Sequence, residues 1–427
     1  MIESTSPRKL SRRLNFAAAR GMIMVTLTNA SNALKDVYLG VVSEQLNTGV
    51  NPLLARIKQT TADVWGKEIR KLAPYGLNGG IGAGTEDGNL PAAGGNNYVQ
   101  FVLGLKNLYG KIEISDKAVR ASENNTGAFV NLLNAEMEGL VRASSYNFGR
   151  MLYGTSKGFL TQITDCDASS NGSISIEVAD TKNIIEGMIV DVISSSGVLT
   201  SSASGSRIVS INRSTNIVVL SGVSTIVADA LNGKYLVVQG SYSYELTGLG
   251  DIFNTSATYL YGVTRASYAW MNPYSEALTA DGNGVTTGSI SDIIMQKAVD
   301  SLDEDADSKV DFIVCSSGVK RNYQEYLASY RSNVDVLDLA GGFKAISFNG
   351  IPVVSDKFCP ANTMYLLNTK EFNLHQLCDW QWLEGENGKI LRQTQGKPTY
   401  SATLVKYADI ICNKPMGQAR LTNITES

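Results

Sequence analysis

The sequence has few residues suited to catalysis and no segment suited to a membrane. Its 427 residues include one histidine, His375, and nine prolines against 40 glycines. With a single histidine, the chain has only one candidate for imidazole catalysis. A low proline content together with frequent glycine favours turns over disordered linkers. No apolar run approaches the roughly 18 residues that span a bilayer. We therefore expect a soluble, ordered protein, long enough for two or three hydrophobic cores.

Charge and cysteine content exclude further classes. The net charge is −3 and the pI is about 5.5, so no overall positive field attracts the chain to nucleic acid or anionic lipid, and any such contact must be local. The cysteines are odd in number and scattered, which indicates free buried thiols from a reducing cytoplasm and neither a disulfide framework nor a zinc site. They are Cys166, Cys315, Cys359, Cys378 and Cys412.

The first twenty residues are locally basic, with five Lys or Arg residues and one Glu. Three interpretations stay open: a flexible tail that contacts nucleic acid, an organelle-targeting segment, or upstream sequence that the fold does not need, with Met22 and Met24 as later starts. After this arm, apolar residues at helical spacing predict a helix over residues 29–57, interrupted near Asn51-Pro52. The candidate DNA contacts in the arm are Arg8, Lys9, Arg12 and Arg13.

Residues 62–73 and 97–115 have the pattern of two extended arms. The stretch between them, residues 75–97, contains eight glycines and almost nothing that can pack. Such a tip cannot build a core of its own. The two strands and their tip therefore form a long excursion that either lies on another surface or stays mobile.

The longest periodic stretch runs from residue 126 to residue 153. Its apolar side chains recur mostly every three or four residues, which is the stripe of an amphipathic helix. Asn125 or Thr126 can cap its start, and Gly154 can end it in a left-handed turn. At 1.5 Å per residue the helix would reach roughly 40 Å, about the width of a domain. We expect the chain to be built along this spine helix.

Between residues 159 and 247 the pattern changes. Short runs rich in valine and isoleucine alternate with Ser, Gly and Asn turns, including Asn171-Gly172 and Asn232-Gly233. This alternation predicts a compact all-β insertion. The insertion holds four basic and eight acidic residues and no tryptophan.

From residue 248 helices and strands mix again, so this α+β part resumes what the insertion interrupts. A helix over residues 290–302 is capped by Ser289 or Ser291, and Asn349-Gly350 closes a hairpin. The other predicted elements are strands at 310–315, 364–367 and 399–412 and a helix at 319–327.

One sequence motif resembles a catalytic signature. Residues 154–158 spell G-x-S-x-G around Ser156, and His375 follows downstream, in the order of a hydrolase. A nucleophile elbow needs a strand, a sharp turn and then a helix, whereas here a helix leads in and a strand pattern leads out. A helix-terminating turn is the better interpretation, and a packed or hydrogen-bonded His375 is the default.

The candidate metal and nucleotide motifs also lack residues that such sites require. Asp303 to Asp307 starts like a calcium loop, but Ser308 and Val314 stand where glycine and a bidentate glutamate are required. The glycines at 79–84 lack the G-x-G-x-x-G spacing and the helix that should follow. We predict a structural protein, with no enzyme activity, cofactor or metal site.

The order of these parts resembles the major capsid protein of tailed bacteriophages, the Hong Kong 97-type fold, over most of residues 30–424. Residues 1–24 are not part of the usual pattern. The matching stretches are LYGKIEISDKAVRAS before the spine, AFVNLLNAEMEGLVRASSYNFGRMLYG as the spine, YELTGLGDIF and YLYGVTRASYAWMNP after the insertion, and FNGIPVVSDKFCPANTMYLLNTKEFNLHQL and VKYADIICNKPMGQARLTNI toward the end.

The resemblance implies an α+β capsid fold of five parts. These are an N-terminal arm at 1–61, an extended two-stranded loop at 62–115, the spine helix of the peripheral domain at 116–158, an all-β insertion domain at 159–247, and the axial domain with the rest of the peripheral domain at 248–427.

The resemblance implies a structural function, in which copies of the chain assemble into a shell. In such proteins the excursion reaches over a neighbouring subunit, and copies form hexamers and pentamers that close into an icosahedral shell around packaged double-stranded DNA. The subunit would assemble in the host bacterial cytoplasm, reside in the virion, and have portal, scaffold and decoration proteins as further partners, with no membrane. The tip residues implied in contacts between subunits are Gly76, Gly79, Gly80, Gly82, Gly84, Gly94 and Gly95.

Two alternative functions, and the possibility of covalent cross-linking between subunits, stay open. The chain resembles an encapsulin-type shell around a protein cargo in the same way, and the insertion is compatible with a β-rich carbohydrate-binding surface protein, although its tyrosines cluster only at its end.

Some capsid proteins cross-link a lysine of the excursion to a neighbour's asparagine. Lys71, Lys106 and Lys111 lie at or near the arms but outside the tip, and no catalytic glutamate can be named, so solvated lysines are the simpler interpretation.

Overall fold

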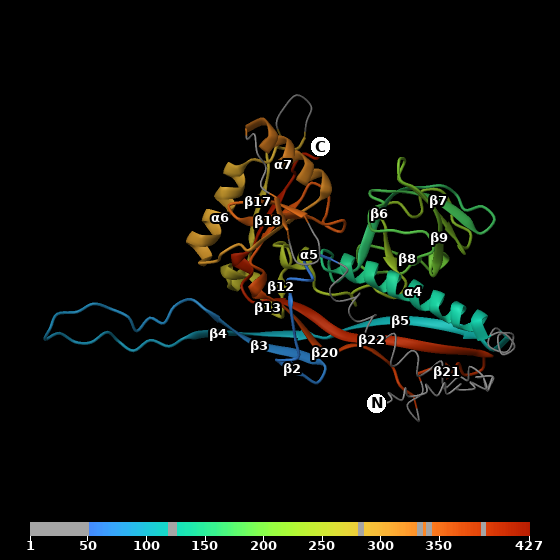
Figure 1. The fold of residues 1–427 in the computed structure, drawn as a ribbon, viewed down its shortest axis with the longest axis horizontal. Helices are drawn as coiled ribbons and strands as arrows, with labels where there is room; N and C mark the ends of the chain where they lie inside the picture. Colours follow the sequence, from blue (N-terminus) through green and yellow to red (C-terminus); the bar gives the residue numbers. More distant parts are fainter. Residues whose placement is uncertain (1–50, 118–125, 281–285, 331–335, 339–343, 386–389) are drawn as a thin grey trace, which may run out of the picture.

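A computed structural model shows an elongated molecule in which a long helix and a long sheet run side by side, a hairpin projects from one end, and two lobes stand beside the sheet (Figure 1). Its mixture of helices and strands confirms the predicted α+β class. The basic arm, with Arg8, Lys9, Arg12 and Arg13, and most of the predicted 29–57 helix lie outside the described residues. The structure describes residues 51–117, 126–280, 286–330, 336–338, 344–385 and 390–427.

The central layer is a five-stranded sheet beside the spine helix α4 (Thr126–Met151), whose existence the apolar periodicity predicted. Strand β5 pairs with β22 in antiparallel register, from Ser115 opposite Thr399 to Lys106 opposite Ala408. The strands are β1 (Lys58–Thr60), β5 (Lys106–Ser115), β20 (Phe372–Trp382), β21 (Arg392–Gln393) and β22 (Thr399–Cys412).

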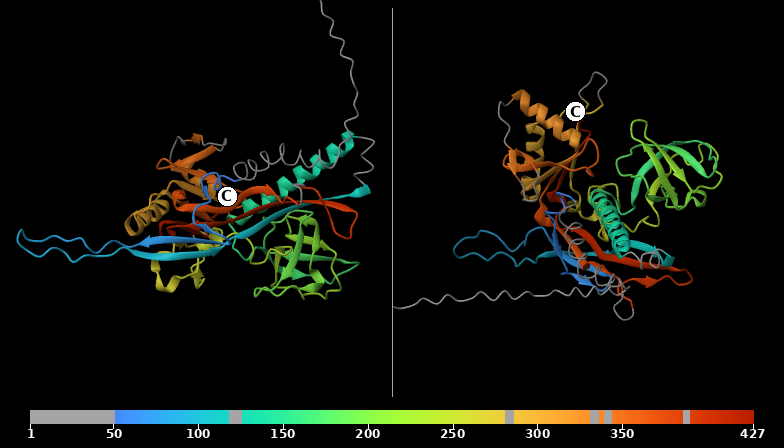
Figure 2. Two further views of the ribbon diagram at one scale, coloured as in Figure 1. Left: turned by 90° about the horizontal axis from the view of Figure 1, so that it is seen from below. Right: turned by 45° about the vertical axis from the view of Figure 1, so that its right-hand side comes forward.

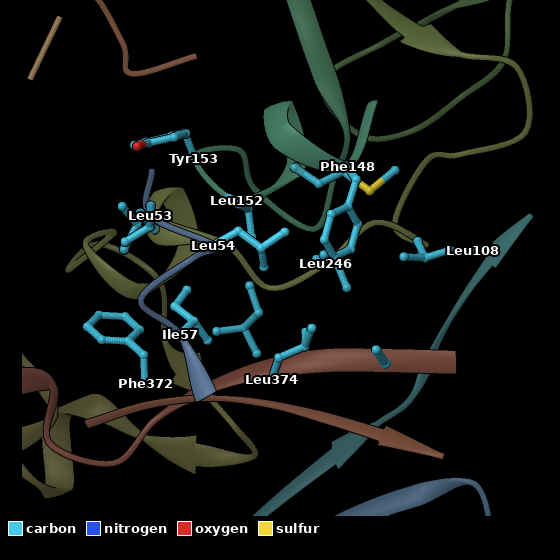
Figure 3. Packing of buried hydrophobic residues seen from close by; sticks show 14 of the residues in the cluster. Leu53, Leu54, Ile57, Leu108, Phe148, Leu152, Tyr153, Leu246, Phe372 and Leu374 are labelled. Atoms are coloured by element: carbon cyan, nitrogen blue, oxygen red, sulfur yellow. The ribbon is translucent and has the colours of Figure 1, made fainter. Parts of the chain in front are cut away.

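One apolar core joins the helix to this sheet. Phe148 comes from α4, Leu152 from the turn that follows it, Leu108 from β5 and Leu374 from β20, and all four are buried (Figure 3). Burying such side chains contributes about 1.5–3 kcal/mol each. This core fixes the spine helix on the sheet and so sets the frame for the parts that project from it.

The described end of the predicted 29–57 helix differs from the prediction. Residues 51–57 form hydrogen-bonded turns that lead directly into β1. The Asn51 Oδ1 atom accepts hydrogen bonds from the amides of Leu53 (2.7 Å) and Leu54 (3.1 Å), which starts a new turn at this point. The two leucines then enter the core beside α4.

The end of the spine helix also differs from the prediction, because Gly154 does not have the left-handed conformation. The Gly154 amide still donates to the Arg150 carbonyl (3.1 Å). The Leu249 amide donates to the Leu152 carbonyl (2.8 Å), and the Gly250 amide to the Gly154 carbonyl (3.1 Å). Because a distant segment satisfies these terminal carbonyls, no glycine cap is needed.

The excursion is a shorter hairpin than predicted. Strands β3 (Glu68–Tyr75) and β4 (Asn97–Gly104) pair with each other, and β2 (Val64–Trp65) joins β3. The second arm was predicted to run to residue 115, but its later part is β5, which leaves the hairpin for the central sheet. The partner strand β22 offers β5 a full row of backbone hydrogen bonds, which explains the departure.

The six strands between residues 159 and 238 close into a barrel, in the order β10-β7-β6-β11-β8-β9. Closure leaves no free sheet edge and buries one face of every strand. At the turn between the first two strands, Asn171 and Gly172 have φ values of 51° and 74°. The strands are β6 (Phe159–Cys166), β7 (Ser173–Val178), β8 (Ile189–Ile193), β9 (Ser206–Asn212), β10 (Ile217–Ser221) and β11 (Tyr235–Val238).

The second lobe is a seven-stranded sheet that shares a core with helices α6 (Asp292–Ala306) and α7 (Ser317–Tyr330). The predicted cap of α6 is Ser291, whose Oγ accepts from the Ile294 amide. The strands are β14 (Tyr274–Ala277), β15 (Phe312–Cys315), β16 (Val336–Asp338), β17 (Lys344–Phe348), β18 (Ile351–Ser355), β19 (Met364–Leu367) and β23 (Ala419–Thr422).

Short elements complete the described chain. They are α5 (Leu249–Ile252), β12 (Tyr259–Leu260), β13 (Val263–Thr264) and the 3₁₀ turns η2 (Ser201–Ala203), η3 (Arg265–Ser267), η4 (Ala269–Met271), η5 (Thr369–Glu371) and η7 (Pro415–Gly417).

Two glycines of α4 give a matched test of how tightly the spine is packed. A Cβ on Gly149 would lie 2.4 Å from the ring of Phe358, whereas a Cβ on Gly139 would meet nothing within 4 Å. We expect Gly149→Ala to destabilise the fold by about 1–3 kcal/mol through overpacking. Gly139→Ala should stabilise it by about 0.5–1 kcal/mol, because alanine loses less backbone entropy in a helix. Chemical denaturation of both variants measures the difference, and equal effects would contradict this packing.

Candidate assembly surface

The β3–β4 hairpin projects beyond the body and carries the predicted contact tip (Figure 2). Its strands keep antiparallel register from Glu68 opposite Gly104 to Tyr75 opposite Asn97. Every residue from 76 to 96 is exposed. The tip therefore buries almost nothing against the described part of its own subunit, so this part of the chain supplies little burial to offset the entropy of ordering it.

The tip glycines allow the two sides of the tip to approach closely. A Cβ on Gly94 would lie 2.4 Å from the Gly80 amide nitrogen, and one on Gly82 would lie 3.0 Å from the Pro91 ring. Side chains at these positions would separate the two sides, so glycine keeps this part of the ribbon thin. The remaining predicted contact glycines have ordinary contact distances or open space around a Cβ; they are Gly76, Gly79, Gly84 and Gly95.

Three aliphatic side chains on the tip were not among the predicted contact residues, which are all glycines. Leu77, Ile81 and Leu90 are 87%, 84% and 90% exposed. The sequence signal that could have identified them is the presence of isolated aliphatic residues in a segment that has no core. Gathered on one projecting tip, they indicate a surface that is buried by something else.

The base of the hairpin, in contrast, is firmly attached. Tyr75 stacks on Trp270 with ring centroids 5.6 Å apart and an interplanar angle of 13°, and Tyr268 packs edge-on against both rings. The Val102 amide donates a hydrogen bond to the Tyr261 carbonyl (3.0 Å). The body thus fixes the direction of the hairpin while its tip stays exposed.

A second conspicuous region is the stem, the two segments that enter and leave the barrel at residues 154–158 and 239–251. Arg150 of α4 reaches Glu245 with Nη1–Oε2 and Nη2–Oε1 distances of 2.9 and 2.5 Å, and the two side chains are only 2% and 1% exposed. The Ser156 amide donates to Asp251 Oδ2 (2.6 Å). These contacts lock the barrel to the C-terminal end of the spine helix.

Asp409 of β22 also holds the stem, from within the core. Its carboxylate accepts hydrogen bonds from the Thr247 amide (2.7 Å), the Thr247 hydroxyl (3.1 Å) and the Ile410 amide (2.8 Å). Burial raises the pKa of Asp409 to about 7, against the opposing effect of these hydrogen bonds and of Lys106.

The raised pKa predicts a pH-dependent effect of Asp409→Asn. In the unfolded chain the carboxyl ionises near pH 4, whereas in the folded chain it stays protonated until about pH 7. Stability contributed by this group is therefore present below pH 4 and lost as pH rises to about 7. We expect Asp409→Asn to raise the melting temperature by a few degrees at pH 8 and to change it much less at pH 4.5. Melting curves at both pH values measure this, and an equal change at both would contradict it.

The candidate hydrolase residues are not assembled into a site. Ser156 contacts Asp251 through its amide, and His375 Nδ1 lies 2.9 Å from the Ala62 carbonyl. His375 is buried, and its Nε2 has no hydrogen-bond partner among the residues that the structure describes, Ser156 included. Burial lowers the pKa of His375. The turn at 154–158 follows α4, as the interpretation of a helix-terminating turn predicts.

Two of the three lysines considered for cross-linking, Lys106 and Lys111, make contacts within the subunit. Lys106 Nζ donates to the Ser243 carbonyl (3.1 Å), and Lys111 lies 3.6 Å from Glu113. A further lysine, Lys406, is fully buried, with Nζ 2.8 Å from Asp379 Oδ1. Burial lowers its pKa. Cross-linking therefore remains without a structural indication among these residues.

Over the described part of the chain, no cluster of three or more His, Cys, Asp or Glu side chains is arranged to hold a metal ion, and the acidic run from Asp303 to Asp307 lies at the C-terminal end of α6. Within the same residues, no helix combines the length and apolarity that crossing a membrane requires.

Comparison with known proteins identifies the fold. No family model and no curated protein matches the sequence. The capsid asymmetric unit of cyanophage A-1(L) aligns over 87% of this chain and 91% of its own, at 13% identity and a TM-score of 0.51. An encapsulin from Synechococcus elongatus PCC 7942 aligns over 88% and 89%, at 9% identity and a TM-score of 0.45, and the capsid of Myoviridae phage XM1 over 87% and 91%, at 9% identity and a TM-score of 0.43. The chain therefore has the capsid fold of tailed bacteriophages, as predicted.

Proposed function

We propose that this chain is the structural subunit of a viral capsid. Copies form hexamers and pentamers that close into an icosahedral shell around double-stranded DNA, in the cytoplasm of a bacterial host. The capsid fold supports a shell protein. The subunit acts by its shape and contacts, and in the proposed virion it would also meet portal, scaffold and decoration proteins.

The observation that carries this proposal is the hairpin. Its base is anchored by aromatic stacking around Trp270, while residues 76–96 are exposed throughout and present three aliphatic side chains. An exposed apolar tip on a fixed support favours association with another copy, because none of the described residues of its own subunit covers it. The proposed contacts between subunits therefore include Gly76, Gly79, Gly80, Gly82, Gly84, Gly94 and Gly95.

Charge supports DNA as the cargo. The whole subunit carries a net charge of −3, and a near-neutral wall holds a packaged genome only weakly, since phosphate contacts by Lys and Arg dominate DNA affinity. In this proposal any direct contact comes from the basic arm, through Arg8, Lys9, Arg12 and Arg13.

Negative-stain electron microscopy of the purified protein, with sedimentation velocity alongside, tests the proposal. Closed shells, or rings of five and six subunits, are the expected result, and nuclease-protected DNA inside shells from infected or expressing cells would identify the cargo. Shells filled with protein would indicate an encapsulin-type compartment. A stable monomer at high concentration under all salt and pH conditions would overturn the proposal.

A further inference from the structure

Asparagine followed by glycine is a chemically labile pair, because the glycine amide nitrogen can attack the asparagine side chain with no Cβ to hinder it. The described part of the chain contains four such pairs, which begin at Asn78, Asn171, Asn232 and Asn349, and all four asparagines are exposed. The further pairs at 283–284 and 387–388 lie outside the described residues. Exposure does not separate the four described pairs, so their hydrogen bonds decide which of them can react.

Two of the pairs have both reacting groups engaged in hydrogen bonds. Asn232 Nδ2 donates to Asp229 Oδ1 (3.0 Å), and the Gly233 amide donates to the Ile163 carbonyl (2.9 Å). The attacking nitrogen and the leaving amide at this pair are therefore both held. The same holds at the second pair, where the acceptors are Gln296 Oε1 for Asn349 Nδ2 (2.7 Å) and Ser347 Oγ for the Gly350 amide (3.1 Å).

The pair at Asn171 lies in a closed hairpin turn. Ser170 and Ser173 exchange backbone hydrogen bonds of 2.8 and 2.9 Å on either side of it. Asn171 and Gly172 have φ values of 51° and 74°, as two-residue hairpin turns require. This turn must open before the backbone can rotate for the attack.

The pair at Asn78 is arranged differently, at the start of the hairpin tip (Figure 2). The Gly80 amide donates to Asn78 Oδ1 (2.9 Å), and Asn78 Nδ2 donates across the ribbon to Asn96 Oδ1 (3.2 Å). Among the described residues the Gly79 amide has no hydrogen-bond partner. The attacking nitrogen is therefore free, while the carboxamide that it attacks is held in place.

The hydrogen bond from Gly80 also favours the reaction electrostatically. When the Gly79 nitrogen attacks Cγ of Asn78, negative charge develops on Oδ1. The Gly80 amide already points at that atom and stabilises the charge, as the donors of an oxyanion hole do. Glycine at position 94 leaves room for this arrangement, because a Cβ there would lie 2.6 Å from Asn78 Oδ1.

We propose that Asn78 is a site of spontaneous deamidation. The Gly79 nitrogen forms a bond to Cγ of Asn78 and loses its proton, while the Cγ–Nδ2 bond breaks and Nδ2 leaves with that proton as ammonia. Water then opens the five-membered imide to give aspartate or isoaspartate. The tip between residues 76 and 96, whose charged residues are Glu86 and Asp87, thereby gains a further negative charge. The reaction requires only the isolated subunit, so it can be tested whether or not shells form.

Peptide mapping by mass spectrometry tests this proposal. The folded full-length subunit is incubated at mildly alkaline pH, and samples taken over time are digested at acidic pH, where the reaction is slow. The conversion of each asparagine to acid is then measured. We expect Asn78 to react at least about tenfold faster than Asn171, Asn232 and Asn349, which must first break the hydrogen bonds of their turns. In denaturant those hydrogen bonds are absent, and the four rates should become similar.

Gly79→Ala is the matched variant. A Cβ on Gly79 would meet nothing within 4 Å, and its φ is not positive, so the ribbon should be unchanged. The added methyl group hinders attack by the adjacent nitrogen, and we expect a several-fold lower rate at Asn78 with the other three rates unaltered. Asn78→Asp provides the ion-exchange standard for the charged product. If folded Asn78 reacts no faster than the other three, or Gly79→Ala reacts as fast as the parent, the proposal is wrong and the proposed shell function is unaffected.

Discussion

A chain in which residues 76–96 are replaced by Asn-Gly is expected to fold normally and to form no shells. Tyr75 and Asn97 are the last register pair of the hairpin, and a two-residue Asn-Gly turn joins antiparallel strands at such a pair. None of the deleted residues is buried. The folded subunit therefore loses no core contact, while the contacts proposed between subunits disappear.

Thermal unfolding and sedimentation velocity separate these two effects. The deletion variant should melt within about 2 °C of the parent, since changes away from buried features cost at most about 0.5 kcal/mol, and should sediment as a monomer. A matched variant keeps the tip length but converts Leu77, Ile81 and Leu90 to serine, and we expect it to assemble poorly as well. A deletion variant that closes normal shells would rule out the tip as an essential contact.

Local patterns in the sequence were sufficient for much of the fold. The apolar period of the spine predicted α4, which runs from Thr126 to Met151. Asn349-Gly350 predicted a hairpin, and these residues have φ values of 49° and 78° between β17 and β18. In these cases the information lies within a few neighbouring residues, in periodicity, caps and turn chemistry.

Features that depend on distant partners were not predictable in the same way. The alternation in residues 106–115 is the same whether the strand extends a free hairpin or joins a sheet, and only β22, nearly 300 residues later, decides between them. Local sequence favoured Gly154 as the helix cap, but the amides of Leu249 and Gly250 donate to the terminal carbonyls instead. Tertiary contacts override local propensity at such positions.

The candidate assembly surface also has one part that the sequence predicted and one part that it did not. The glycine-rich composition located the tip at residues 76–96, because a segment with so little apolar content cannot build a core of its own. The pocket where the barrel meets the spine helix was not predictable, since it is lined by α4, β5, β20 and the segment that leaves the barrel, which meet only in the folded chain. The ion pair between Arg150 and Glu245 joins two of these segments across 95 positions.

Breaking that ion pair is expected to be the most destabilising single change near the stem. Arg150 also donates through Nη2 to Asn147 Oδ1, at 2.6 Å, in a part-buried hydrogen bond. Glu245→Leu would leave the Arg150 guanidinium buried without its counter-charge, and such a loss costs about 3–5 kcal/mol. Chemical denaturation of the purified subunit measures this cost, and the barrel should lose its fixed position on α4 at the same time.

Two comparison variants show whether charge pairing is the cause. The exposed pair Arg70–Glu68, with side chains 54% and 32% exposed, is the matched control, and Glu68→Ala should cost less than about 1 kcal/mol. The double variant Arg150→Met with Glu245→Leu removes both charges, and an apolar pair of similar volume is commonly as stable as a buried ion pair. It should therefore recover most of the lost stability. If the double variant is as unstable as the sum of its single variants, the cost comes from lost packing at the stem and not from an unpaired buried charge.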